Sequence, residues 1–276
     1  TTSGCSGQAS TLAADPSVRP HVIFVMILSI STLLIYPSDT NNNQIKNRIQ
    51  IKTIVSYNYN LSNNYIYTRS EKKLYYDEYG YLIMQMYSNK SGEYKASDIF
   101  SNVYDENGKI KEIYSFYGDN ISSPYAKVTF ERNEKGDIVC SKSKSLRDKD
   151  FFNNILNSEE YFIYDTNHLL IRQEKILENG KTLSLLHYKY DNKCRNTELI
   201  INVPGTTLKS SLKYLYNGNN LLIQQIDFDF HENIHHYSIH NYDENNVLTN
   251  EVSYNCQSNK NILSFITEYR YAYYNE

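Results

Sequence analysis

Four histidines lie within ten residues of one another, at His231, His235, His236 and His240. Imidazole nitrogens bind zinc and copper, so this stretch is the clearest candidate for metal chemistry in the chain. On a strand His236 and His240 would share one face, whereas His231 and His235 lie beside an expected turn. A metal-binding surface protein that uses residues 231–240 is therefore one functional alternative, although we assign no metal ligand.

The segment Asp105-Glu106-Asn107-Gly108 begins like a calcium-binding loop. The acidic ligand that closes such a loop does not follow, so a turn capped by the Asp105 side chain is the favoured interpretation. The cysteines Cys5, Cys140, Cys194 and Cys256 have no metal or redox spacing. We expect Cys140 to be a small buried residue and Cys194 to lie in a turn, and leave disulfide pairing open.

No nucleophile elbow, phosphate loop or isolated pair of carboxylates is present, and we assign no catalytic or cofactor-binding residue and no cofactor. Glu159-Glu160 and Asp148-Lys149-Asp150 are interpreted as solvated loop charges. We therefore expect a protein that is not an enzyme. Tyrosines expected on the wet face of a sheet, Tyr75, Tyr81 and Tyr161, have the amphipathic rings that stack on sugars.

The elements that position these residues belong to a repeat. Taking the tyrosine of Tyr104-Asp105 as position zero, copies begin at Tyr76, Tyr104, Arg132, Tyr164, Tyr190, Tyr216 and Tyr242, with a truncated copy at Tyr271. The next residue is Asp or Asn in all seven complete copies, and the residue at position four is Gly or Asn in five of them. Asp and Asn cap turns and Gly or Asn accept a positive φ, so each copy predicts a β-hairpin turn.

Large apolar or aromatic residues stand two positions before most anchors, and an aliphatic residue stands six positions after all but one. Because strand residues alternate between faces, even offsets are predicted to face the core and odd offsets water. This places Ile226, Phe228, Val252 and Tyr254 in the core. Asn102, Asn196 and His240 break the core pattern in three repeats, and would mark a ligand pocket if they converged.

The predicted fold is all-β: an antiparallel meander of about 14 strands, built from hairpin repeats of 26–32 residues, in a curled or closed sheet. A short helix or long loop is expected over residues 146–156. The predicted domains are a disordered leader at 1–21, a hydrophobic signal or anchor segment at 22–36, a polar linker at 37–47 and the repeat domain at 48–276.

The 28 basic and 31 acidic residues are interspersed and leave a net charge of −3, which excludes an electrostatic footprint for nucleic acid. The apolar run at 22–36 follows Arg19 and predicts export, with contact to a membrane only through that run. The expected location is extracytoplasmic, that is secreted, periplasmic or anchored at the cell surface.

The repeat resembles the YD repeats of the RHS family, in the segments Leu74–Leu82, Tyr104–Ile110 and Tyr188–Asp191. The resemblance implies an extended, curling antiparallel sheet on an exported protein that encloses a toxin segment or binds surface glycans. A chain with so few repeats is too small to enclose another domain. We expect a non-catalytic exported module with a structural role or a binding role, with a cell-surface glycan or protein as partner. A transmembrane β-barrel of an outer membrane is the alternative, because alternating antiparallel strands after an export signal are also its pattern.

Overall fold

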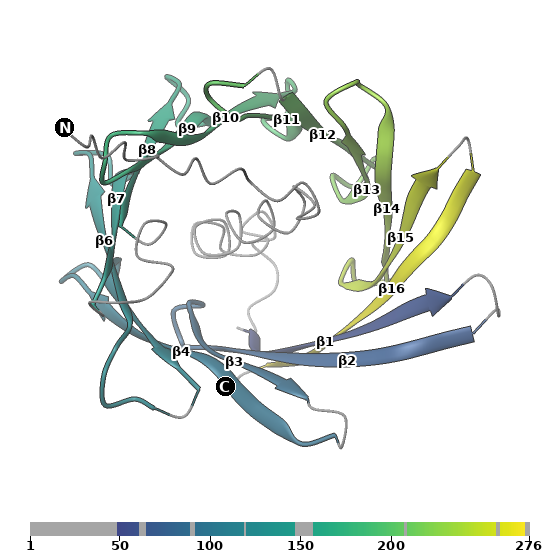
Figure 1. The fold of residues 1–276 in the computed structure, drawn as a ribbon, viewed down its shortest axis with the longest axis horizontal. Coiled ribbons are helices and arrows are strands. Elements are labelled where there is room, and N and C mark those ends of the chain that lie inside the picture. The colour runs from purple at the N-terminus through teal and green to yellow at the C-terminus, as the bar shows by residue number, and fades with distance from the viewer. Residues whose placement is uncertain are drawn as a thin grey trace, which may run out of the picture. The chain divides into compact units, whose positions relative to one another are not determined.

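The computed structural model describes residues 49–60, 65–88, 92–118, 120–146, 157–206, 209–257 and 260–273. These residues form 16 antiparallel strands, each paired with its neighbours in sequence, and β1 pairs with β16 to close a barrel (Figure 1). The prediction of an antiparallel all-β meander is confirmed, with two strands more than expected.

The strands are β1 (Ile49–Asn60), β2 (Tyr65–Tyr76), β3 (Leu82–Ser88), β4 (Tyr94–Tyr104), β5 (Ile110–Tyr117), β6 (Ala126–Arg132), β7 (Ile138–Ser145), β8 (Ser158–Tyr164), β9 (Leu170–Leu177), β10 (Thr182–Tyr190), β11 (Asn196–Asn202), β12 (Lys209–Tyr216), β13 (Leu222–Phe228), β14 (Ile234–Tyr242), β15 (Leu248–Gln257) and β16 (Lys260–Tyr273). The leader, signal or anchor segment and linker predicted for residues 1–47 lie outside the described residues, as do residues 147–156 of the predicted helix or loop. No helix among the described residues is long and apolar enough to cross a membrane.

The Asp or Asn after each anchor caps a turn, as predicted. In the turn after β4, the Asp105 Oδ1 atom accepts hydrogen bonds from the backbone N–H groups of Asn107 and Lys109, each at 2.9 Å. The backbone N–H of Asp105 also donates to the Lys109 carbonyl. The equivalent side chain makes the same pair of bonds in all seven turns, at Asp77, Asp105, Asn133, Asp165, Asp191, Asn217 and Asp243.

Position four of every complete repeat has a positive φ, including the two copies in which the residue is neither Gly nor Asn. His168 has a φ of 63° and Cys194 a φ of 61°. This left-handed conformation is sterically unfavourable for an L-residue that carries a side chain. The Asp cap and the two flanking strands therefore impose the turn even where the local residue does not favour it.

Each of these turns is followed by a shift in strand register. Tyr104 pairs with Ile110, but the preceding Val103 pairs with Glu112, so Lys111 is an extra residue in β5. The same shift occurs at all seven anchors. An extra residue of this kind reverses the parity of everything beyond it in the outgoing strand.

The bulge corrects the predicted faces of the outgoing strands. Ile226 and Phe228 pair with Lys213 and Ser211, whereas the inward Tyr214 pairs with Gln225. The face opposite the core therefore carries Ile226, Phe228, Val252 and Tyr254. Between the last two, Ser253 is the buried residue.

Nearly all the buried side chains lie on the face that carries the anchors, which we call the inner face. Side chains converge on the concave side of a closed sheet and spread apart on its convex side, so the buried face is the one that lines the barrel. Leu82, Ile110, Leu170, Leu222 and Leu248 each pair with an anchor and share this face, as predicted. Leu82 and Ile110 are fully buried, whereas the other three are only half-buried.

The anchors tie successive hairpins together. The Tyr164 hydroxyl donates to the carbonyl of Ile138, six positions after the previous anchor, at 2.9 Å. Tyr190, Tyr216 and Tyr242 make the equivalent bond to Leu170, Asn196 and Leu222, at 2.8–2.9 Å. Arg132 replaces the tyrosine in one repeat and donates to the Ile110 carbonyl at 3.2 Å. The repeat is thus defined by a bond between repeats as well as by its turn.

Tyr164→Phe is expected to lower the free energy of unfolding by about 1 kcal/mol, because it removes one part-buried hydrogen bond between repeats. Tyr161→Phe is the control, since this residue of the same strand is exposed and faces outward. Urea denaturation of both variants measures the difference. Equal effects of the two substitutions would contradict the role assigned to the anchor.

Candidate functional site: the polar inner wall

The inner face contains buried polar side chains among its apolar ones. The buried polar residues are Gln85, Ser115, Ser141, Ser158, Glu160, Gln173, Lys175, Ser184, Ser238 and Ser253, and the strand register places all of them on the inner face. A wall that serves packing alone avoids such groups, because their desolvation is costly without partners. The inner wall is therefore the best candidate for a binding surface.

The densest part of this wall lies on β8, β9 and β10. The Tyr188 hydroxyl donates to Gln173 Oε1 at 2.6 Å, and Gln173 Nε2 donates to Glu160 Oε1 at 2.9 Å. The glutamine side chain is thereby fixed, and it holds the Glu160 carboxylate. This corrects the interpretation of Glu159-Glu160 as loop charges: both lie in β8, and Glu160 faces inward and is only 5% exposed.

A second cluster of polar side chains lies on β14, β15 and β16. Glu251 pairs with His240 across the strands, and its carboxylate accepts from Tyr269 at 3.0 Å and from Ser253 at 3.2 Å. Burial lowers the pKa of His240, whereas the nearby Glu251 opposes this effect. The Nε2 atom of His240 is buried and finds no hydrogen-bond partner among the described residues.

The three residues that break the core pattern do not converge. Asn102 lies on β4, Asn196 on β11 and His240 on β14, and β4 and β11 lie on opposite sides of the ring in Figure 1. Each has one buried polar atom that finds no partner in the described part of the chain, namely Oδ1 in the two asparagines and Nε2 in His240. Asn102 uses its amide nitrogen to bond the Leu82 carbonyl and Asp77. They are separate substitutions in the wall and do not form one pocket.

The histidine cluster is dispersed in the same way. His231 lies in the turn between β13 and β14, while His236 faces inward beside Asp227, with Nδ1 and Oδ2 3.5 Å apart. His240 is four residues farther along the strand, roughly 13 Å at the usual rise per residue. No group of three metal-ligating side chains comes together within the described residues.

The cysteines and the Asp105 segment were weighed as metal sites in the sequence, and the structure gives each a structural setting. Cys140 is buried, Cys194 is exposed in its turn, and Cys256 is half-buried; all three are free thiols. Cys5 lies outside the described residues. Backbone N–H groups, foremost that of Lys109, lower the pKa of the Asp105 carboxyl, and its Oδ1 atom is engaged in capping the turn.

The tyrosines proposed for sugar stacking do not form one surface. Tyr75 and Tyr161 are on the outer face of different hairpins. Tyr81 lies in the turn after β2, where its ring centroid is 5.6 Å from that of Tyr104. The outer face therefore has no continuous platform made of these three residues.

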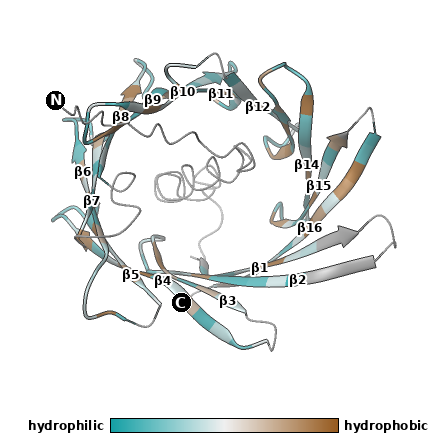
Figure 2. Cartoon of the chain, viewed as in Figure 1, coloured by the Kyte–Doolittle hydropathy of each residue, from teal (hydrophilic) through white to brown (hydrophobic). Residues whose placement is uncertain are grey.

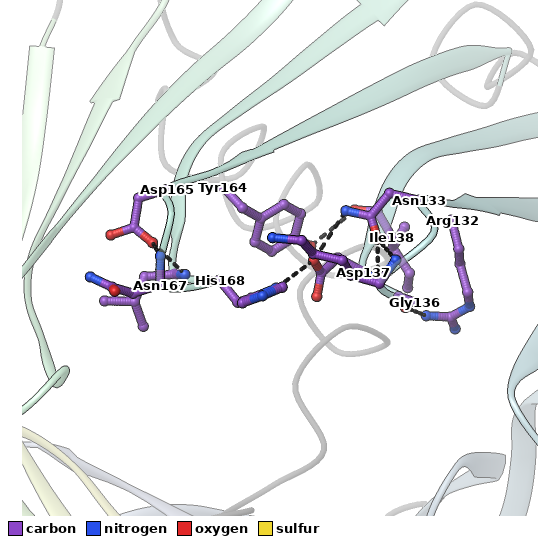
Figure 3. A network of polar contacts seen from close by, with 11 residues as sticks. Arg132, Asn133, Gly136, Asp137, Ile138, Tyr164, Asp165, Asn167 and His168 are labelled. Atoms are coloured by element: carbon purple, nitrogen blue, oxygen red, sulfur yellow. Dashed lines mark hydrogen bonds and ion pairs between the residues drawn. The ribbon is translucent and has the colours of Figure 1, made fainter.

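The ends of neighbouring hairpins are linked by a polar network, shown in Figure 3. Asp137 Oδ2 lies 2.9 Å from His168 Nδ1 in the next turn and accepts from Asn133 at 3.1 Å. Arg195 makes a comparable link, donating to Asn220 of the following turn at 3.2 Å. These contacts join one turn to the next along this end of the barrel.

This network predicts that the stability of the fold decreases at acidic pH. The Asn133 amide and then His168 lower the pKa of Asp137, so the carboxylate stabilises the fold above the ordinary aspartate pKa of about 4. This stabilisation is lost as the pH falls through the lowered pKa. The free energy of unfolding of Asp137→Asn, measured in urea, is therefore expected to decline less than that of wild type between pH 5 and pH 2.5. His168→Ala should show an intermediate decline, and a wild-type slope in both variants would contradict the assignment.

The outer face is charged over a large part of the barrel. Ion pairs lie there between Glu112 and Lys127 at 2.9 Å and between Lys189 and Glu198 at 2.6 Å. Further outward pairs among the described residues are Arg69–Glu71, Lys142–Glu131, Lys142–Glu159, Arg172–Glu174 and Arg270–Glu268. Figure 2 shows hydrophilic residues on strands around the ring. On the outer face of β12–β15, one cross-strand row contains Leu215, Gln224, Ile239 and Val252, three of which are apolar.

The fold and the wall define a class of protein: a closed antiparallel β-barrel of 16 strands, built from Asp-capped hairpins, with a polar inner wall. Its fold is similar to that of a porin-like protein from Bacteroides uniformis, with a TM-score of 0.51 and 13% identity over 81% of this chain and 96% of that one. A weaker likeness, with a TM-score of 0.36 and 12% identity, is to a chain of the TcdB2-TccC3-Cdc42 complex, of which this chain covers 14%.

No protein-family model matches the sequence, and no curated protein matches it. The structural likeness to the porin-like protein supports the barrel fold, whereas the resemblance to YD repeats rests on the sequence motif. The inward-facing polar residues of β7–β10 were missed by sequence reasoning. The bulge after each turn could have revealed them. When one extra residue is counted after the turn, strand alternation places Gln173 and Lys175 on the inner face.

Proposed function

We propose that this chain is an exported, non-catalytic barrel module that binds a polar ligand, a surface glycan in particular, on its inner wall. The observation that carries the proposal is the set of buried polar side chains on the inner face. Amide, hydroxyl and carboxylate groups beside aromatic rings such as those of Phe162 and Tyr188 match the hydroxyls and apolar faces of sugars.

The absence of catalysis is part of this proposal. Part of the wall is held by side-chain hydrogen bonds, as in Tyr188–Gln173–Glu160, and these groups serve as fixed donors and acceptors. A glycan is expected to be recovered unchanged after binding.

The test is a glycan array probed with the full chain, followed by mass spectrometry of each bound glycan after prolonged incubation. The proposal expects at least one glycan class to bind and its mass to stay constant. Binding of no glycan would contradict the binding role, and a changed mass would contradict the non-catalytic role.

An outer-membrane barrel is the second candidate. The closed sheet and the apolar side chains of Leu215, Ile239 and Val252 on the outer face of β12–β15 favour it. The ion pairs on the outer face of β5–β11 oppose it, because charged side chains facing lipid near the bilayer midplane cost about 2–4 kcal/mol each. Alkaline carbonate extraction of cell envelopes separates the two: we expect release of the protein, whereas retention in the membrane pellet would favour the second candidate.

A further inference from the structure

A row of four buried polar side chains crosses the inner wall from β7 to β10. Ser141 pairs with Glu160, Glu160 with Lys175, and Lys175 with Ser184. All four are at most 8% exposed. Opposite side chains in such pairs have Cβ atoms about 4.5–5.5 Å apart, so the four residues form one continuous patch.

The charges in this patch do not neutralise each other by direct contact. Glu160 and Lys175 stand opposite each other, yet the carboxylate accepts from Gln173 and forms no ion pair with the ammonium. The Lys175 ammonium has no hydrogen-bond or ion-pair partner among the contacts of the described residues. Burying an ammonium without a partner is costly, so the arrangement suits an external acceptor.

The Lys175 ammonium also remains accessible. The partnerless polar atoms that are fully enclosed in the described residues are Asn102 Oδ1, Arg172 Nε, Asn196 Oδ1 and His240 Nε2. Since the ammonium is not among them, its tip keeps contact with solvent although the side chain is largely buried. A ligand that displaces this solvent would contact the ammonium.

The chemistry of the patch selects a type of ligand. One positive and one negative group lie side by side, so the patch has no net charge. A ligand must supply an acceptor for the ammonium and a donor for the carboxylate on neighbouring atoms. Two vicinal hydroxyls do both, because each hydroxyl donates and accepts. Phe162, inward on β8 and two residues from Glu160, adds an apolar ring surface beside these groups.

We propose that Glu160 and Lys175 bind a neutral sugar through two adjacent hydroxyl groups, one accepting from Lys175 Nζ and one donating to Glu160. Gln173 is a positioning residue, since its amide holds the carboxylate and is itself held by Tyr188. The proposal deepens the proposed function, on which it rests, by naming the ligand class and the site.

The test measures binding of three methyl glycosides to the full chain by calorimetry: neutral methyl glucoside, methyl glucuronide and methyl glucosaminide. Wild type should bind the neutral sugar best. Glu160→Gln leaves a positive patch and should lose at least tenfold in affinity for methyl glucoside while gaining preference for the glucuronide. Lys175→Met leaves a negative patch and should shift preference to the protonated glucosaminide. Tyr161→Phe, on the outer face of the same strand, is the control and should bind as wild type does.

The opposite shifts in sugar preference distinguish a ligand contact from a structural role, because a variant that only loosens the wall weakens all three sugars alike. Thermal melts of each variant check the fold. Gln173→Met, which removes the amide that holds Glu160 without adding a charge, serves as a second variant with the same expected loss of affinity for the neutral sugar. If glycans bind on the array but the variants leave the preference unchanged, this site is wrong and the proposed function stands. If wild type binds no glycan at all, both are wrong.

Discussion

Ile113→Asp is expected to prevent the barrel from folding. Ile113 is 1% exposed on the inner face of β5 and pairs with Asn102. A carboxylate there has no cationic partner across the strand, and an unpaired buried charge costs several kcal/mol against a total stability of about 5–15 kcal/mol. Circular dichroism and size-exclusion chromatography of the purified variant should show loss of the β-sheet signal and aggregation.

Ile163→Asp is the matched control. Ile163 is also a strand isoleucine, but it faces outward on β8, is 44% exposed and pairs with Arg172. This variant should fold with a stability close to that of wild type. An equal loss of folding in both variants would contradict the assignment of faces. Leu222, which the sequence marks as core, is only half-buried, so Leu222→Asp should be less damaging than Ile113→Asp.

Removal of β16 is expected to have an effect of similar size. β16 pairs with both β15 and β1, from Ile49 to Asn58 of β1, so its deletion opens the barrel and exposes two long strand edges. Unpaired strand edges of this length pair with other chains and so promote aggregation. The chain ending at Gln257 should be insoluble or oligomeric by light scattering. Arg270→Ala, an outward substitution in β16, is the control and should remain monodisperse; a monodisperse truncated chain would show that closure is not needed for the fold.

The turns were predictable from sequence because their determinants are local. An Asp or Asn followed three residues later by Gly or Asn specifies the cap and the left-handed residue within five positions of chain. His168 and Cys194 adopt the same backbone without the favoured residue, which shows that the flanking strands supply the rest. The bond from each anchor tyrosine to the previous hairpin is not local, and the sequence alone offers no means of finding its acceptor.

The faces of the outgoing strands were predicted wrongly for a physical reason. A bulge accompanies a type I turn that ends in a left-handed residue, but the predicted faces were counted without it. The bulge exchanges the two faces, so Ile226 and Phe228 point outward while Gln225 points inward. The polar character of the inner wall was hidden by this exchange. Closure between β1 and β16 depends on residues more than 200 positions apart in the chain, which no local pattern encodes.

Closure of the sheet is the claim on which the inner wall and its sites depend, and a disulfide between β1 and β16 tests it most directly. The hydroxyl oxygens of Ser56 and Thr267 lie 3.4 Å apart across these strands, so Ser56→Cys with Thr267→Cys, in a chain whose native cysteines are replaced by serine, should cross-link on mild oxidation. We expect a monomeric product 2 Da lighter than the reduced protein by mass spectrometry, and no such product for the control pair Ser56→Cys with Ser115→Cys on β5. Persistence of two free thiols in the Ser56/Thr267 variant, or equal cross-linking of both pairs, would contradict a closed barrel.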